Sequence, residues 1–399
     1  MARWEGMSAW DQEIRQRMAM IRDQGRLRKS IPTSEAVQAV LIRDGKRLIN
    51  LSSNNYLGLA NHPTLIKAQQ EGACLGAGAT ASRLIVGHAK ETAELEEELS
   101  SYKGTESSIV FTSGYTANIG VLSSLLRRGD VVFSDRLNHA SIIDGIRLSG
   151  ARLYRYRHND LDHLEWQLKE ADRGGIRNRL IVTDTVFSMD GDIAPLADIV
   201  QLKEKFGAAL MIDDAHGGGV LGFEGKGTAD YLGVTEGVDF HMGTFSKAYG
   251  VSGAYVAGKK EWIEYVENTC RSLIYTTALP PTVIAGIRAS IRLVRQREDL
   301  RNDLVKNSNV FRNQLRQAGF DTGGSTTQII PVMVGGAEQA VQFSDLLCER
   351  GVLSVGIRPP TVPEGEARLR FTLMATMEES HLHQAITAII ETGQQLGVI

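Results

Sequence analysis

Short apolar runs alternate with longer helical patterns through the middle of the chain. Most of the runs are almost wholly apolar and rich in β-branched or aromatic residues; they lie at 108–112, 131–134, 153–156, 180–183 and 209–213. Such runs are typical of strands covered on both faces, as in a parallel sheet. The alternation therefore predicts an α/β domain in which ligands bind at the carboxyl ends of the strands.

The pattern differs towards both ends of the chain. Apolar residues at helical spacing among many charges predict an amphipathic helix at 10–28. A long helical segment at 281–300 precedes further helices and short strand-like runs at 329–334 and 369–373. This change of pattern predicts a second, smaller α+β domain after the α/β domain.

The length of 399 residues is typical of one large domain with a smaller partner. We expect an N-terminal helix with short strands at 1–55, a large ligand-binding domain at 56–285 and a small α+β domain at 286–399. Hydrophobic residues make up 42% and charged residues 23% of the chain, the balance of an ordinary globular protein.

Charge and cysteine content exclude several classes of protein. The formal net charge is −3 and no basic stripe occurs, so we do not expect nucleic acid as a partner. No run approaches about 18 apolar residues and the N-terminus is highly charged, so we expect a cytoplasmic protein with no membrane contact. The three cysteines are too widely spaced for a redox pair or a zinc site, and no metal is expected.

The segment 243–250, GTFSKAYG, places Lys247 in a turn after a strand that is expected to end near Met242. A lysine amine flanked by small residues can form a Schiff base with a bound aldehyde. Hydroxyls such as that of Thr244, together with backbone amides, can hold a phosphate beside it. A solvated surface lysine would leave the same local pattern, so this segment alone does not decide between the two interpretations.

The segment 211–219, MIDDAHGGG, puts Asp213 at the carboxyl end of an apolar strand and His216 three residues later. A carboxylate beside a pyridine nitrogen keeps that nitrogen protonated, which pyridoxal phosphate (PLP) needs in order to withdraw electrons. His216 would then hydrogen-bond the ring hydroxyl. Helix capping by the aspartate and a metal pair of Asp and His are the alternatives.

Two further segments follow strands in the same way. SDRLNHASIIDG at 134–145 contains His139, whose flat imidazole can stack on a cofactor ring. TSGYTAN at 112–118 offers the backbone amides of Gly114 and Tyr115 to a phosphate. A hydrogen-bonded loop histidine and a simple helix cap are the alternatives.

Polar groups that could orient the others occur in two more places. TDTVFSMDGD at 183–192 closes a strand with Asp184 and Ser188, although a turn would explain part of this segment. Arg370 lies in the strand-like run ARLRF, where a guanidinium can bind an amino acid carboxylate through two hydrogen bonds. A surface ion pair is the alternative for this arginine.

Five segments together resemble the α-oxoamine synthase family of fold-type I PLP enzymes. They are LNHASIIDG, TDTVFSMDGD, MIDDAHGGG, GTFSKAYG and RPPTVPEGEARLRF, in the family's order. The resemblance spans nearly the whole chain and implies a mostly parallel seven-stranded sheet between helices, with a smaller C-terminal α+β domain. It also implies an acyltransferase that condenses an amino acid with an acyl thioester, releasing carbon dioxide and a free thiol.

The resemblance implies a role for each candidate residue. Lys247 would hold the cofactor as a Schiff base, Asp213 would pair with the ring nitrogen, and His139 would stack on the ring. The other cofactor contacts would be Gly114, Tyr115, Asp184, Ser188, His216, Thr244 and Thr277. Substrate contacts would come from Arg28, Asn54, His139, Thr361 and Arg370. Thr277 would act across an interface, which implies a homodimer with shared active sites.

The choice of substrate is less constrained than the reaction class. RPPTVPEGEARLRF resembles the family members that join L-alanine to a pimeloyl thioester, on coenzyme A or a carrier protein, in biotin synthesis. The closing QQLGVI and the stretch from LNHASIIDG to RYRHND resemble those that join glycine to acetyl coenzyme A in threonine and glycine metabolism. We expect alanine and the pimeloyl donor, with glycine acetylation as the alternative.

A dinucleotide-binding enzyme is a further alternative, because 76–81 matches G-x-G-x-x-A. A helical pattern at 62–75 precedes this run, whereas a dinucleotide-binding turn must follow a strand. The sequence therefore disfavours a dehydrogenase. A non-catalytic protein that keeps the fold is also disfavoured, since every residue type needed for PLP chemistry is present.

Overall fold

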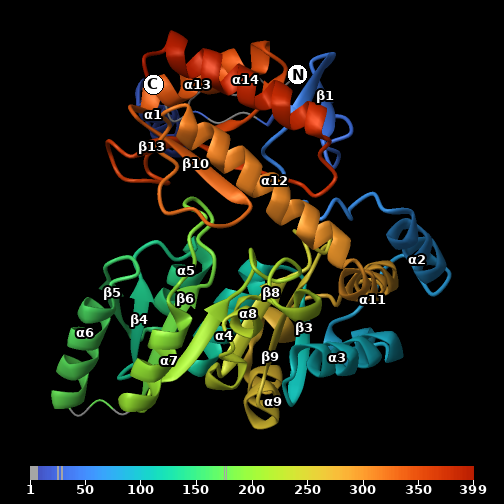
Figure 1. Cartoon of the computed structure of the whole chain (residues 1–399). Coiled ribbons are helices and arrows are strands. Elements are labelled where there is room, and N and C mark those ends of the chain that lie inside the picture. Colours follow the sequence, from blue (N-terminus) through green and yellow to red (C-terminus); the bar gives the residue numbers. More distant parts are fainter. Residues whose placement is uncertain (1–7, 25–26, 28–29, 175, 177) are drawn as a thin grey trace.

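The computed structural model of the chain describes residues 8–24, 27, 30–174, 176 and 178–399. A seven-stranded sheet forms the centre of its large domain (Figure 1). In spatial order the strands are β3 (Ser107–Phe111), β9 (Ala254–Gly258), β8 (Phe240–Thr244), β7 (Ala209–Asp213), β6 (Arg179–Asp184), β4 (Val131–Asp135) and β5 (Arg152–Tyr156). Only β9 runs antiparallel to its neighbours. The predicted mostly parallel sheet is therefore confirmed.

Helices cover both faces of this sheet, which explains why its strands are apolar on both sides. One apolar cluster joins the strands to α4 (Gly114–Leu125), α5 (Ala140–Ser149), α9 (Lys260–Thr269) and α10 (Arg271–Ile274). A second joins them to α6 (Leu161–Arg173), α7 (Leu196–Lys205) and α8 (Thr228–Tyr231). The carboxyl ends of the parallel strands are left free to carry polar groups.

A third, larger cluster connects the large domain to the C-terminal part of the chain. It includes residues of α2 (Pro63–Ala73), α3 (Lys90–Lys103), α11 (Pro281–Gln296), α12 (Glu298–Gln317), α13 (Ala337–Glu349) and α14 (Glu379–Gln395). A short π-helix (Arg83–Gly87) lies between α2 and α3, and short 3-10 turns occupy Phe223–Gly225 and Thr235–Gly237. Two long consecutive helices, α11 and α12, thus lead from the large domain to the C-terminal part of the chain (Figure 1).

Two small sheets complete the fold. In one, β10 (Ile329–Gly335), β13 (Ala367–Thr372) and β12 (Val355–Ile357) are antiparallel. In the other, the central strand β2 (Lys46–Asn50) pairs antiparallel with β1 (Val40–Arg43) and parallel with β11 (Val352–Leu353). The N-terminal strands therefore belong to the same layer as the C-terminal segment, and the domain limits at 55 and 285 stay predictions.

The predicted N-terminal helix is present as α1 (Ala9–Asp23), with Ser8 as its N-cap and no buried residue. Part of its predicted extension to residue 28 lies outside the described residues. None of the described helices has the length and apolar character needed to cross a membrane. The run 76–81 follows α2 instead of a strand, which contradicts a dinucleotide-binding turn.

Candidate active site

A cavity of about 220 Å³ lies where the strands end. Asp184, Asp213 and Thr244 are the last residues of β6, β7 and β8, Gly114 is the first residue of α4, and His139 is the N-cap of α5. Nine of the ten predicted cofactor contacts line the cavity: Gly114, Tyr115, His139, Asp184, Ser188, Asp213, His216, Thr244 and Lys247. The parallel strands therefore bring together residues that are far apart in the sequence.

Lys247 lies in densely packed surroundings but keeps part of its surface accessible, as expected of a side chain in a cavity wall. Burial lowers its pKa to about 8, although the nearby carboxylates of Asp213 and Asp184 oppose the shift. A lysine with such a pKa has an appreciable fraction of free amine near neutral pH. The alternative of a solvated surface lysine is therefore wrong.

A directed chain of hydrogen bonds starts at Lys247. Its Nζ is 3.0 Å from Nε2 of His216, whose Nδ1 is 2.6 Å from the Tyr56 hydroxyl, and this hydroxyl donates to Oδ1 of Asn54 at 3.1 Å. Because Tyr56 has only one proton to donate, it accepts from Nδ1 of His216, and Nε2 accepts from the lysine. Burial, with Lys247 next in effect, lowers the pKa of His216 well below its ordinary value, which fits a neutral imidazole.

The same chain ends at the residues predicted to bind the substrate carboxylate. Nη2 of Arg370 donates to Oδ1 of Asn54 at 3.0 Å, and its Nε donates to the backbone carbonyl of Ser188. Ser188 itself lines the cavity. Arg370, on β13 of the small sheet, is therefore held beside the cavity of the large domain.

Both carboxylate oxygens of Asp213 accept hydrogen bonds. Its Oδ2 accepts from Nδ2 of Asn118 at 2.8 Å, and its Oδ1 accepts from the backbone N–H of Ala215 at 3.0 Å. No helix begins at this position, so helix capping is not its role. No group of three or more His, Cys, Asp or Glu side chains within the described residues is arranged to hold a metal ion.

Asn118, which was not among the predicted site residues, connects Asp213 to His139 through Ser141. Nδ2 of Asn118 also donates to Oγ of Ser141 at 2.9 Å, and this oxygen is 2.7 Å from Nδ1 of His139. The Ser141 backbone N–H also points to Nδ1, at 3.3 Å, so Nδ1 is an acceptor and Nε2 carries the proton. Asn118 follows Gly114 by four residues on the same helix. This spacing within the TSGYTAN segment could have indicated that both residues lie on the cavity side.

Two polar atoms in the cavity wall have no partner among the described residues: Oδ1 of Asp184 and Oδ1 of Asn118. Burial and the charge of Asp213 raise the pKa of Asp184 well above its ordinary value. Buried polar atoms are nearly always satisfied, so unpaired ones in a cavity wall fit a polar ligand. In the same cavity, the hydroxyls of Thr244 and Ser246 are 2.8 Å apart, and Thr244 lies beside Gly114 in the first turn of α4. This set fits a flat heterocycle that carries a phosphate.

Two predicted contacts, Thr277 and Thr361, do not line the cavity in this chain. Thr277 is exposed and pairs with Ser82 in an isolated bridge. Thr361 is exposed in a turn, where its N–H donates to the carbonyl of Arg358. Arg28 lies outside the described residues.

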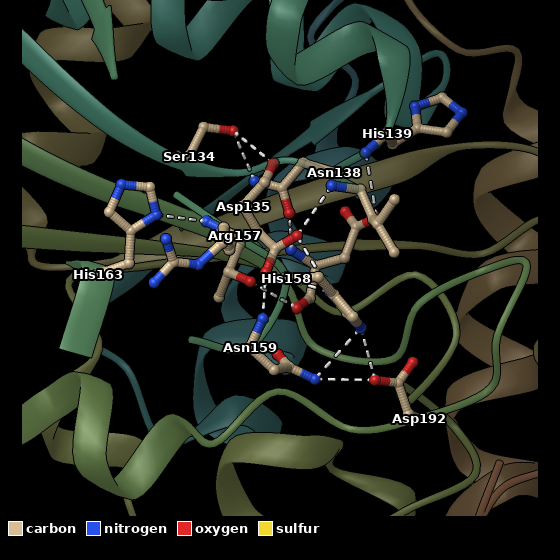
Figure 2. A network of polar contacts seen from close by, with 12 residues as sticks. Ser134, Asp135, Asn138, His139, Arg157, His158, Asn159, His163 and Asp192 are labelled. Atoms are coloured by element: carbon tan, nitrogen blue, oxygen red, sulfur yellow. Dashed lines mark hydrogen bonds and ion pairs between the residues drawn. The ribbon is translucent and has the colours of Figure 1, made fainter. Parts of the chain in front are cut away.

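A second polar cluster lies beside the cavity and is centred on His158 (Figure 2). Nδ1 of this histidine is 3.1 Å from Oδ1 of Asp135, and its Nε2 is 2.7 Å from Oδ2 of Asp192. Burial lowers the pKa of His158, but the hydrogen bonds with the two carboxylates outweigh it and raise the pKa to about 9. A protonated imidazole therefore joins two carboxylates.

We expect this charge to make stability depend on pH. Because the pKa in the folded state exceeds the ordinary value of 6.5, the stabilisation is complete below pH 6.5 and is lost as pH rises through about 9. The shift corresponds to about 3 kcal/mol. Urea unfolding at about pH 6 and about pH 9.5 should show the stability difference between wild type and His158→Gln shrinking by that amount. An unchanged difference would contradict the assignment of the charge.

The fold and the cavity together define the class of protein. A mostly parallel seven-stranded sheet, with an aspartate and a lysine facing one cavity at its carboxyl edge, is the fold of a type I PLP-dependent transferase. Residues 46–389 match the aminotransferase class I and II family, and the chain belongs to that family.

Individual relatives agree with this classification. The 8-amino-7-oxononanoate synthase of Citrifermentans bemidjiense is 52% identical over 358 residues, which cover 89% of this chain and 92% of that protein. A solved structure of SPT with the PLP internal aldimine has a TM-score of 0.90 at 32% identity and covers 98% of both chains. The structure of 8-amino-7-oxononanoate synthase from Francisella tularensis has a TM-score of 0.76 at 28% identity, covering 88% of this chain and 99% of that chain. The predicted family resemblance is confirmed.

Proposed function

We propose that this protein is a PLP-dependent acyltransferase that condenses L-alanine with a pimeloyl thioester to form 8-amino-7-oxononanoate, carbon dioxide and a free thiol. The observation that carries the proposal is the cavity that Lys247 and Asp213 share. The names of the relatives support the choice of product, and they do not favour glycine acetylation. The reaction belongs to biotin biosynthesis.

When bound, PLP supplies an electron sink for the α-carbon of the amino acid. Lys247 would hold the cofactor, and its free amine would serve as the base for the α-proton, for which a pKa near neutrality is suited. Asp213 would keep the ring nitrogen of a bound cofactor protonated, and His139 would stack on its ring with Nε2 protonated. His216 accepts from the lysine amine and orients it.

The amino acid binds on the side of the small sheet formed by β10, β13 and β12. Arg370 and Asn54 offer donors for the carboxylate of the amino acid, close to Ser188 in the cavity wall. Arg28 and Thr361 belong to the route of the acyl thioester, whose carrier is coenzyme A or an acyl carrier protein.

The donor and acceptor are tested by one set of assays. Alanine and glycine are each supplied with pimeloyl and acetyl coenzyme A, and free thiol is measured. We expect kcat/KM for alanine with the pimeloyl donor to exceed that for glycine with the acetyl donor by about tenfold or more. A preference for glycine and acetyl coenzyme A would overturn the proposed substrate.

The pKa of Lys247 predicts how the apoprotein takes up its cofactor. Only the free amine attacks an aldehyde, so the rate of PLP capture should rise by about tenfold per pH unit below the pKa and flatten above it. We expect the bend near pH 8, because burial lowers the pKa to about 8. Absorbance after mixing apoprotein with PLP measures this rate; a bend near 10.5, the ordinary lysine value, would contradict the assignment.

The proposed assembly is a homodimer with shared active sites. The π-helix exposes three consecutive apolar side chains, Leu84, Ile85 and Val86, by 53%, 74% and 75%, and contiguous exposed apolar groups often mark interaction surfaces. Thr277 pairs with Ser82, which directly precedes this helix. A second chain packed against the helix would therefore bring the cavity of that second chain close to Thr277. Light scattering should give twice the mass of the chain, and Ile85→Glu should reduce it to the mass of one.

A further inference from the structure

The hairpin at 186–193, between β6 and α7, connects the two parts of the active site. Val186 and Ile193 pair as an antiparallel bridge, and the N–H of Phe187 donates to the carbonyl of Asp192 at 3.1 Å. Ser188, near the tip, lines the cofactor cavity. The position of this short hairpin therefore sets part of the cavity wall.

The tip of the hairpin is attached to the C-terminal part of the chain. Asp190 forms an ion pair with Arg368, and the carbonyl of Ser188 accepts from Arg370, both on β13. The carbonyl of Gly191 accepts from Oγ1 of Thr327 at 2.9 Å. A Cβ at Gly191 would collide with the backbone carbonyl of Ile329, the first residue of β10, so the hairpin lies directly against the start of that strand.

The base of the hairpin is attached to the large sheet through His158 (Figure 2). The imidazole joins Asp192 of the hairpin, at 2.7 Å, to Asp135, the last residue of β4, at 3.1 Å. The ring also packs edge-on against Phe187, with centroids 4.3 Å apart. Among the described residues, His158 is the only basic side chain that forms an ion pair with Asp192. The neighbouring amide of Asn159 adds one neutral hydrogen bond, at 2.8 Å.

We propose that His158 is a positioning residue: by fixing the hairpin to the end of β4, it sets Ser188 and Arg370 at the distance from the cofactor cavity that amino acid binding needs. His158 does not line the cavity itself. The inference rests on the proposed function, because Arg370 is taken to bind the carboxylate of the amino acid. Other ionisable groups near the imidazole are Asp190, which is paired with Arg368, and Tyr156, which lies near Asp135.

The test compares His158→Gln with His163→Gln. His163 lies on the next helix and accepts from the N–H of Arg157, without contact to the hairpin, so it provides a matched histidine control. For His158→Gln we expect the KM for alanine to rise by about tenfold or more, with kcat and the KM for the pimeloyl donor changed by less than about threefold. His163→Gln should have the constants of the wild type.

Hydrogen exchange of residues 186–193 supplies a readout that needs no substrate. We expect exchange in this hairpin to become about tenfold faster in His158→Gln and to stay unchanged in His163→Gln. Asp192→Asn, which alters the hairpin side of the same contact, should reproduce both effects if His158→Gln folds poorly. Unchanged hairpin exchange, or equal losses in kcat and both KM values, would overturn the proposal. Wild-type enzyme without thiol release would instead count against the proposed function alone.

Discussion

Lys247→Ala should abolish thiol release, with a fall in kcat of about four orders of magnitude or more. The substitution removes both the attachment point of the cofactor and the base that moves the α-proton. The absorbance spectrum of the PLP-loaded variant should differ from that of the PLP-loaded wild type, because the variant has no Lys247 amine to bind PLP covalently in the cavity. Steady-state kinetics and absorbance spectra measure both effects.

The control for this prediction is Lys260→Ala. Lys260 is an exposed lysine at the start of α9, on a helix that packs on the sheet without reaching the cavity. It should have wild-type kinetics and spectrum. Residual activity of Lys247→Ala within about tenfold of the wild type would remove the lysine from the chemistry.

Asp213→Asn should lower kcat by about a hundredfold or more while the fold is kept. Asparagine has the shape of aspartate but carries no negative charge, so it cannot keep the ring nitrogen protonated. Its amide would also face Nδ2 of Asn118, which now donates to the carboxylate at 2.8 Å. The measurement is kcat together with the cofactor spectrum.

The adjacent Asp214 provides a contrast within the same motif. Its Oδ1 accepts from the hydroxyls of Thr185 and Thr228, each at 2.6 Å, and it does not line the cavity. Asp214→Asn should therefore lower the free energy of unfolding by about 1–3 kcal/mol and leave the cofactor spectrum unchanged. Equal catalytic losses at both positions would show that Asp213 has no special role.

The sequence predicted the large sheet well because its parallel strands are buried on both faces. The runs at 131–134, 180–183 and 209–213 lie within the observed strands, since a continuous apolar run between turns has few other uses. The antiparallel strand β9 was not predicted. Its run AYVAG is short, contains small residues and follows a glycine-rich turn, so local sequence resembles a loop.

The candidate site was predictable where residues follow strands, and less so where contacts depend on packing between distant segments. Asp213 and Asp184 end strands, which is visible in the pattern. Tyr56 lies in an irregular segment near the N-terminus and meets His216 only because the small sheets pack against the large domain. No spacing rule connects residues 160 positions apart, so the hydrogen-bond chain from Lys247 to Arg370 required the structure.

The most direct measurement of the central claim is borohydride reduction of the protein loaded with PLP, followed by peptide mass spectrometry. The account predicts a reduced cofactor adduct on the peptide that contains Lys247, in an amount close to one per chain. An adduct on another lysine, or no adduct on a protein that binds PLP, would contradict it.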